Sequence, residues 1–96
     1  MDERVLRAFA VTAELGRLDL AAQQLGYAQP TVSYQIRSLE NDLGVRLFLR
    51  SCNGMRLTSA GTTVLPTVRA VLLLVQSIRS TVRPVDGPRP QPVGPG

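Results

Sequence analysis

The sequence predicts a mainly α-helical fold, made of a three-helix core, a β-hairpin and a long fourth helix. Three observations support this prediction. Apolar residues recur at helical spacing in four stretches, a glycine follows each of the first three, and an Asn-Gly pair separates two short β-like runs. A chain of 96 residues suffices for one small domain, and its single cysteine excludes a scaffold held together by disulfides.

The first two predicted helices are short, and both stop at a glycine. Apolar spacing of i, i+3, i+4 and i+7 predicts a helix over residues 2–15 that ends at Gly16 and buries Leu6, Phe9, Ala10 and Ala13. Asp19 is a favourable N-cap for a second helix of two turns over residues 20–25, which ends at Gly26. Two adjacent alanines in this helix are small enough to let a neighbouring helix approach closely.

A third helix is predicted to begin at Gln29 and Pro30, since proline is tolerated in the first helical turn, and to end at Gly44. Its buried side is marked by the spacing +4, +3, +4 of the residues Val32, Ile36, Leu39 and Leu43. At about 100° per residue, the opposite side is polar and is centred on Pro30, Tyr34, Arg37 and Asn41. The helix therefore has one apolar face and one polar face.

After this helix the periodicity changes from helical to β-like. Residues 47–50 and 55–58 are short β-like runs around a Ser-Cys-Asn-Gly turn, and the pair Asn-Gly favours a hairpin. Thr58 can cap a fourth helix over residues 59–83. Pro66 lies inside this helix and should either bend it or mark a delayed start.

Composition separates the end of the chain from the rest. Residues 84–96 contain five prolines and three glycines, so they are predicted to form a disordered tail. The predicted organisation is a helical domain with its hairpin over residues 1–58, a long helix over residues 59–83, and this tail.

The charge of the chain is positive and unevenly distributed. All 11 basic residues are arginines, and the net charge is +4. Residues 1–26 carry three arginines against four acids, a net −1, whereas residues 27–96 carry eight arginines against three acids, a net +5. The middle and the end of the chain therefore favour a polyanionic partner.

Several functional classes are excluded by what the sequence lacks. It has no His, no cluster of metal ligands, no paired carboxylates in a plausible cleft and no glycine-rich phosphate loop, so we expect no enzyme, no metal and no cofactor. The N-terminus has no secretory signal, and the apolar stretch 64–78 is too short and too polar to span a bilayer. A soluble cytoplasmic protein is expected.

The order of the predicted elements is that of a winged helix-turn-helix, in which the short second helix braces the third and the third enters the DNA major groove. Polar residues near the start of the third helix should reach bases first, and these are Gln29, Thr31, Ser33, Tyr34 and Arg37. Gln29 can pair with adenine, and Arg37 can reach guanine or a phosphate. The hairpin, or wing, contributes residues suited to phosphates or the minor groove, namely Arg50, Asn53 and Arg56.

The residues themselves leave a simpler alternative open. Gln29, Ser33 and Tyr34 could be solvated surface residues, and Arg56 could lie over its own hairpin with its apolar stem. Cys52 has no second cysteine to resolve it and is most simply interpreted as incidental.

Several stretches resemble the N-terminal DNA-binding domain of LysR-type transcriptional regulators. The similar segments are their opening helix, second helix, recognition helix, wing and entry to the linker helix, at residues 6–16, 20–25, 28–40, 43–50 and 56–61. The similarity runs from about residue 3 to residue 80 without a gap, and the combination of motifs is highly specific.

The resemblance implies a winged domain that binds a partly palindromic promoter site as a homodimer joined through the linker helix. It places the DNA-facing positions at Gln29, Pro30, Thr31, Ser33, Tyr34, Arg37, Arg50 and Arg56. Three residues depart from the family pattern: Ala28 replaces a capping Ser, Tyr34 replaces a common Arg, and Asn53 replaces a basic residue. The family's large effector-binding domain is absent, so we expect no small-molecule effector site in this chain.

The apolar stripe of the fourth helix is the expected dimerisation surface, formed by Val64, Leu65, Val68, Leu72, Val75 and Ile78. A helix of about 25 residues is about 37 Å long, longer than a core of this size covers. Burial against a symmetry mate would give a two-fold interface. The alternative is that the stripe folds back onto its own domain. A second possible function is an interaction protein that forms mixed dimers with full-length LysR-type subunits through this helix.

Overall fold

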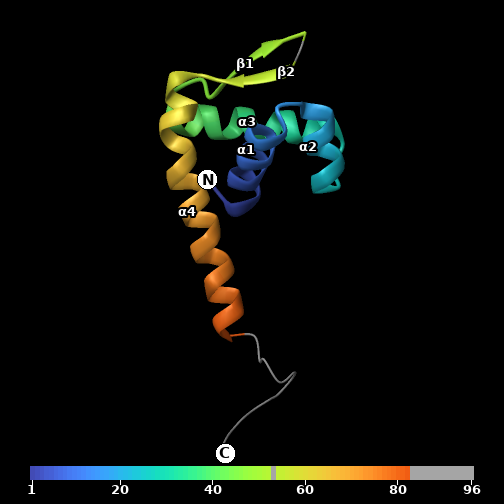
Figure 1. Ribbon diagram of the computed structural model, residues 1–96. Coiled ribbons are helices and arrows are strands. Elements are labelled where there is room, and N and C mark those ends of the chain that lie inside the picture. The colour runs from blue at the N-terminus through green and yellow to red at the C-terminus, as the bar shows by residue number, and fades with distance from the viewer. Residues whose placement is uncertain (53, 83–96) are drawn as a thin grey trace, which may run out of the picture.

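The computed structural model describes residues 1–52 and 54–82, and it shows three short helices, a hairpin above them and a long helix that leads away (Figure 1). The elements, in chain order, are α1 (Glu3–Leu15), α2 (Leu18–Leu25), α3 (Gln29–Leu43), β1 (Phe48–Ser51), β2 (Gly54–Leu57) and α4 (Ser59–Val82). The strands pair antiparallel. The predicted fold class, a winged helix-turn-helix followed by a long helix, is confirmed. Asn53 and the predicted tail, residues 84–96, lie outside the described residues.

The beginnings of the helices follow from local hydrogen bonds, with one correction. Asp2 caps α1, because its carboxylate accepts the backbone N–H groups of Arg4 (2.8 Å) and Val5 (3.3 Å). The prediction that Asp19 caps α2 was wrong, since Arg17 holds the cap position and makes no side-chain cap bond. The Asp19 carboxylate instead accepts two hydrogen bonds from the Arg17 guanidinium, at 3.1 and 2.8 Å.

The first three helices end at the predicted glycines, and each of these glycines is left-handed, with φ between 72° and 78°. Leu43, the last residue of α3, was predicted to be buried but is 37% exposed. The reason is its position, because the last side chain of a helix has helical neighbours on one side only. The other three residues of the predicted stripe, Val32, Ile36 and Leu39, are buried.

The core lies where α1, α3 and the hairpin meet. Phe9 from α1 and Phe48 from β1 are enclosed, and their rings meet edge to face with centroids 5.5 Å apart. Leu47, just before β1, is fully buried in the same cluster. The wing is therefore built into the core at its base, and its position depends on how the helices pack.

The first turn of α4 is fastened to the loop before the wing. The Thr58 hydroxyl donates to the Arg46 carbonyl (2.6 Å) and accepts the backbone N–H of Gly61 (3.0 Å), so Thr58 caps α4 as predicted. Gly61 is buried against the carbonyl of Leu47, and a Cβ at this position would overlap that oxygen. Position 61, in the first turn of α4, thus requires a residue without a side chain.

The two halves of α4 have different surroundings. Leu65 and Val68, in the first half, are buried in the core, whereas the last turns of the helix extend beyond the domain (Figure 1). Pro66 lies inside the helix and does not delay its start, which is at Ser59. The first half of α4 is therefore a fourth core helix, and the second half projects from the domain.

Within the described residues, α4 is also the one helix that could cross a membrane by length and composition alone. It has 24 residues, and an 18-residue window reaches a mean hydropathy of 1.4. The expectation that this segment is too short considered only residues 64–78 and was too narrow, because the helix extends at both ends. Its first half packs against a core, which is also typical of a helix in a folded domain.

Replacing Gly61 by Ala tests how α4 is fastened. In an exposed helix this change stabilises by about 1 kcal/mol, but here the new Cβ would overlap the Leu47 carbonyl. We expect Gly61→Ala to lower the free energy of unfolding in urea by about 2 kcal/mol. The exposed neighbour provides a control, since Thr62→Ala should change it by less than about 0.5 kcal/mol. Unchanged or increased stability of Gly61→Ala would contradict the close contact.

Candidate nucleic-acid interface

The polar face of α3 lies open to solvent over the length that the sequence assigned to DNA. The exposed residues are Gln29, Pro30, Thr31, Tyr34 and Arg37. Tyr34 is 69% exposed, so both its ring and its hydroxyl are accessible on this face. An α-helix with an uncovered polar face has the size and chemistry to enter a major groove.

Arg50 connects the wing to this face of α3. It lies on β1 in register with Met55, and it shares its face of the hairpin with the buried Phe48. Its guanidinium donates a hydrogen bond to the hydroxyl of the half-buried Ser33 on α3, at 2.5 Å. Two residues that the sequence assigned to DNA separately are therefore direct neighbours.

Arg56 lies on the other face of the hairpin. It pairs with Leu49 in the strand register, and successive residues of a strand point to opposite faces. Both side chains are exposed, Leu49 at 57%. The two wing arginines consequently belong to different surfaces, a separation that the sequence analysis did not make.

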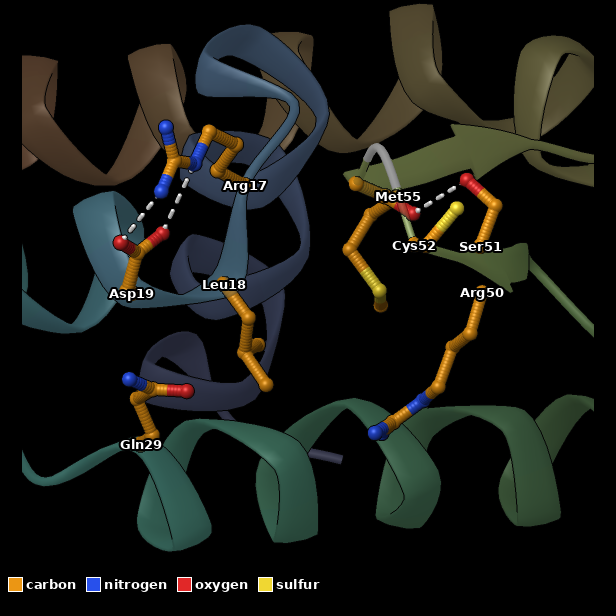
Figure 2. Close-up of a pocket in the computed structure, with 9 residues that line it drawn as sticks. Arg17, Leu18, Asp19, Gln29, Arg50, Ser51, Cys52 and Met55 are labelled. Carbon is orange, nitrogen blue, oxygen red and sulfur yellow. Dashed lines mark hydrogen bonds and ion pairs between the residues drawn. The ribbon is translucent and has the colours of Figure 1, made fainter.

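A groove of about 590 Å³ separates the beginning of α3 from the wing (Figure 2). Gln29 lines it from α3, Arg50 from β1, and the pair Arg17 and Asp19 from the start of α2. This pair is neutral as a whole, so Arg50 supplies the net positive charge of the groove. Neither this groove nor any other part of the described chain gathers three His, Cys, Asp or Glu side chains that could hold a metal ion.

Glu40 holds the end of α3 to the beginning of the wing. Its carboxylate accepts the backbone N–H groups of Leu47 (2.8 Å) and Phe48 (3.3 Å) and lies 3.6 Å from the Arg46 guanidinium. The Glu40 side chain is only 12% exposed, so these amides are satisfied in a site largely shielded from water. The contact fixes where the first strand begins relative to α3.

The second strand is held at the turn between α1 and α2. The backbone N–H of Met55 donates to the Gly16 carbonyl, at 2.9 Å. Gly54 has a φ of +133° and lies so close that a Cβ would overlap the same carbonyl. Gly54 of the Asn-Gly pair thus has a second role besides the hairpin turn, because the absence of a side chain lets the wing pack against the turn between α1 and α2.

The stripe expected to mediate dimerisation is divided between two environments. Leu65 and Val68 are buried in the chain's own core, and Val64 and Leu72 pack against it. The alternative that the stripe folds back onto its own domain therefore holds for this part of it. These four side chains are occupied within the chain, and a partner would have to bind elsewhere on α4.

Exposed apolar side chains continue along the second half of α4. Val75 is half-buried, and Ile78 is 64% exposed. With Ile78, three further residues recur at spacing 3, 4 and 4 and form an apolar surface, here called the exposed stripe: Val71, Leu74, Ile78 and Val82. Of the six residues expected from the sequence, only Ile78 belongs to it.

A protein-family model matches residues 4–62, which include α1, α2, α3, the wing and the first turn of α4. It describes bacterial regulatory helix-turn-helix proteins of the lysR family. This chain belongs to the lysR family. The family assignment agrees with the resemblance noted in the recognition helix and the wing.

Relatives of this lysR-family chain are transcriptional regulators. The HTH-type transcriptional regulator ClcR of Pseudomonas putida is 44% identical over 79 residues, which are 82% of this chain and 27% of ClcR. The first curated relatives are matched over 25% to 33% of their length. The chain thus corresponds to about a quarter to a third of such regulators.

Two solved structures are similar over most of this chain, and both contain DNA. The DNA-binding domain of CbnR in a DNA complex has a TM-score of 0.77 and 38% identity, and the match covers 86% of this chain and 100% of that one. The DNA-binding domain of BenM, bound to benA site 1 DNA, has a TM-score of 0.79 and 32% identity, with coverage of 84% and 94%.

The sequence analysis of this lysR-family chain missed Glu40, although a signal was present. Glu40 follows Ile36 by four residues and Leu39 by one, so at about 100° per residue it falls on the margin of the buried stripe. A glutamate that becomes buried at such a position is almost always paired. Its backbone partners, however, are 7 and 8 residues away in the loop and could not be identified without coordinates.

Removing the Glu40 carboxylate should loosen the wing. Glu40→Ala leaves two shielded N–H groups without an acceptor, so we expect the free energy of unfolding to fall by about 2–3 kcal/mol. Asp42→Ala is the matched control, because Asp42 lies on the same helix but is 45% exposed and, among residues 1–52 and 54–82, forms its ion pair with the N-terminal amine. Its loss should cost at most about 1 kcal/mol. Equal losses in the two variants, measured by urea titration, would refute the anchoring role of Glu40.

Proposed function

We propose that this chain binds double-stranded DNA sequence-specifically, with α3 in the major groove and the wing against the adjacent backbone or minor groove. The observation that carries the proposal is the hydrogen bond from Arg50 to Ser33, because it sets a wing cation beside the polar face of α3. Sequence-specific binding needs base-reading side chains next to cations that hold the backbone. The DNA complexes of the similar CbnR and BenM domains support the same function.

The proposed roles follow from position on this surface. Gln29 lines the groove at the beginning of α3 and pairs with an adenine edge, for which its amide supplies both a donor and an acceptor. Pro30, Thr31 and Tyr34 add contacts along the exposed face, with Tyr34 in place of a common Arg. Arg50 and Arg56 hold phosphates from the two faces of the wing. We place this activity in the bacterial cytoplasm, where promoter DNA lies.

We further propose that the chain acts as a homodimer, joined through the exposed stripe of α4, on a partly palindromic site. Three of the four residues in the stripe, Leu74, Ile78 and Val82, are between 64% and 74% exposed. They lie on the second half of α4, whose end extends beyond the domain (Figure 1), although Arg79 in this half pairs with Glu3 on α1. A second copy offers the same stripe, and two such surfaces form a self-complementary interface.

A lipid surface is the competing occupant of the exposed stripe, because α4 is apolar enough for a membrane by composition. The second copy is favoured because the first half of the same helix is already packed in a soluble core. Two DNA-binding domains on one dimer also raise affinity through effective concentration. Mixed dimers with other LysR-type subunits would use the same surface, but no feature of this chain favours them.

Selection of bound duplexes from a random DNA pool tests the proposed function directly. The chain should enrich one motif, and the motif should contain two half-sites related by a two-fold axis. Enrichment of a single half-site would contradict the homodimer but not DNA binding. A pool that remains random after several rounds, with binding that disappears as salt is raised, would contradict sequence-specific binding altogether.

Gln29→Ala should weaken binding to the selected site by about 1–3 kcal/mol and relax the preference at one base pair of each half-site. Binding to unrelated DNA should stay nearly the same, because the side chain reads a base rather than a phosphate. Gln76→Ala, which removes an exposed glutamine from α4, is the matched control and should leave both affinities unchanged. Fluorescence anisotropy with the two duplexes measures this, and equal losses on both would show that Gln29 reads no base.

Leu74→Glu with Ile78→Glu should convert the dimer into a folded monomer, since it places charges in the centre of the exposed stripe. We expect much weaker binding to the full site and little loss on an isolated half-site. Leu73→Glu with Ser80→Glu adds the same charges on the opposite side of α4, and this variant should remain a dimer. Sedimentation equilibrium decides between them. The dimer would be contradicted if the original chain sedimented as a monomer and bound lipid vesicles.

A further inference from the structure

A second groove, of about 570 Å³, lies towards the C-terminal end of α3. Arg37 and Asn41 line it from α3, and Arg46 lines it from the loop before the wing. Arg50 lines this groove as well as the groove of Figure 2, so the two are neighbours on one surface. Arg46 was not among the residues that the sequence assigned to DNA.

The second groove is strongly positive. Three of its residues are arginines, and Glu40 is its one acid. The Glu40 carboxylate accepts the backbone N–H groups of Leu47 and Phe48 and lies 3.6 Å from the Arg46 guanidinium, so it offsets one of the three positive charges. Arg37 makes no ion pair with an acid in the part of the chain that the structure describes. With three arginines against this one carboxylate, the groove keeps an excess of positive charge.

Arg46 is held in place while most of it remains accessible. Its side chain is 66% exposed, its guanidinium lies 3.6 Å from the Glu40 carboxylate, and it donates to the Phe48 carbonyl at 3.4 Å. A guanidinium has five N–H donors, so these contacts leave others available for an anion. An arginine that is already oriented loses less freedom when it binds.

The end of α3 does not prevent an anion from binding there. A helix C-terminus carries partial negative charge on its last carbonyls, which opposes an anion. The Glu40 carbonyl, however, accepts the backbone N–H groups of Gly44 (2.8 Å) and Val45 (3.2 Å). This carbonyl is therefore bonded within the chain, and beside it three guanidinium groups against one carboxylate leave a net charge of +2 among the residues that line the groove.

We propose that the second groove binds a phosphate of the DNA backbone, held between Arg46 and Arg37. Arg46 is then an additional DNA-contacting residue, and Arg37 contacts a phosphate rather than a guanine. Arg50 continues the same basic path to the wing, and the bases are read by the beginning of α3. This inference rests on the proposed DNA binding. It adds where along α3 a phosphate of the DNA backbone would lie.

Arg46→Met tests the proposal, because it removes the charge and keeps most of the apolar stem. Arg4→Met is the matched control. Arg4 is 70% exposed and lies 3.8 Å from the Asp2 carboxylate, so it resembles Arg46 in exposure and in its loose acidic partner, but it lies on α1. Far-ultraviolet circular dichroism and urea titration confirm that both variants are folded. Arg46→Lys, which keeps the charge, provides a second variant.

The affinity for the selected duplex is measured over a range of salt concentrations. Each lost phosphate contact lowers the slope of log affinity against log salt concentration by about 0.9 in magnitude, so on an isolated half-site, where one contact is lost, the affinity falls about eightfold more at 0.1 M salt than at 1 M. We expect this change for Arg46→Met and not for Arg4→Met or Arg46→Lys. An unchanged slope for Arg46→Met on a duplex that the original chain binds would overturn the second groove alone.

Uncharged methylphosphonate groups, placed one at a time along the duplex, identify the phosphate. The original chain and Arg4→Met should lose affinity severalfold at one position of each half-site, and at that position Arg46→Met should lose less, because Arg37 alone remains to hold the phosphate. If every position affects Arg46→Met as it affects the original chain, the groove binds no phosphate and the proposal is wrong. Failure of the original chain to bind any duplex is a different result, and it would overturn the proposed function itself.

Discussion

The contact of the Glu40 carboxylate with the backbone N–H groups of Leu47 and Phe48 determines how the parts of this molecule are joined. Leu47 also accepts the N–H of Thr58 with its carbonyl (3.0 Å), and the same carbonyl lies against Gly61. One buried residue at the base of the wing is thus bound by α3 and by the beginning of α4. The helix α3, the wing and the long helix α4 therefore keep a fixed relation.

This fixed base contrasts with the exposed surface that we propose binds DNA. The Glu40 contact is shielded, and its loss would leave buried donors without acceptors. The bond between Arg50 and Ser33 is exposed, and such a bond can be exchanged for a phosphate at little cost, because water and DNA both offer acceptors. The structure therefore combines a shielded frame with exposed side chains, and on the proposed function these side chains exchange their partners for DNA.

Local patterns predicted most of the fold, and contacts between distant segments account for what they missed. Apolar spacing and the helix-ending glycines placed the helices, because both act within a few residues. The cap of α2 was misplaced because Arg17 competes for the Asp19 carboxylate. The apolar stripe of α4 was assigned to a partner although Leu65 and Val68 fill the chain's own core, since spacing alone shows which face is apolar and not what covers it. The strand register, and with it the separation of Arg50 from Arg56, likewise required coordinates.

The central claim is that α3 and the wing form one DNA-binding surface, and backbone amide chemical shifts of the isotope-labelled chain test it most directly. Titration with the selected duplex should shift the amides of residues 29–37 and of the wing together and with the same midpoint. The amides around Arg4 on α1 should remain unchanged, because they lie outside this surface. Shifts confined to α1 and α4, with α3 and the wing unaffected, would contradict the account.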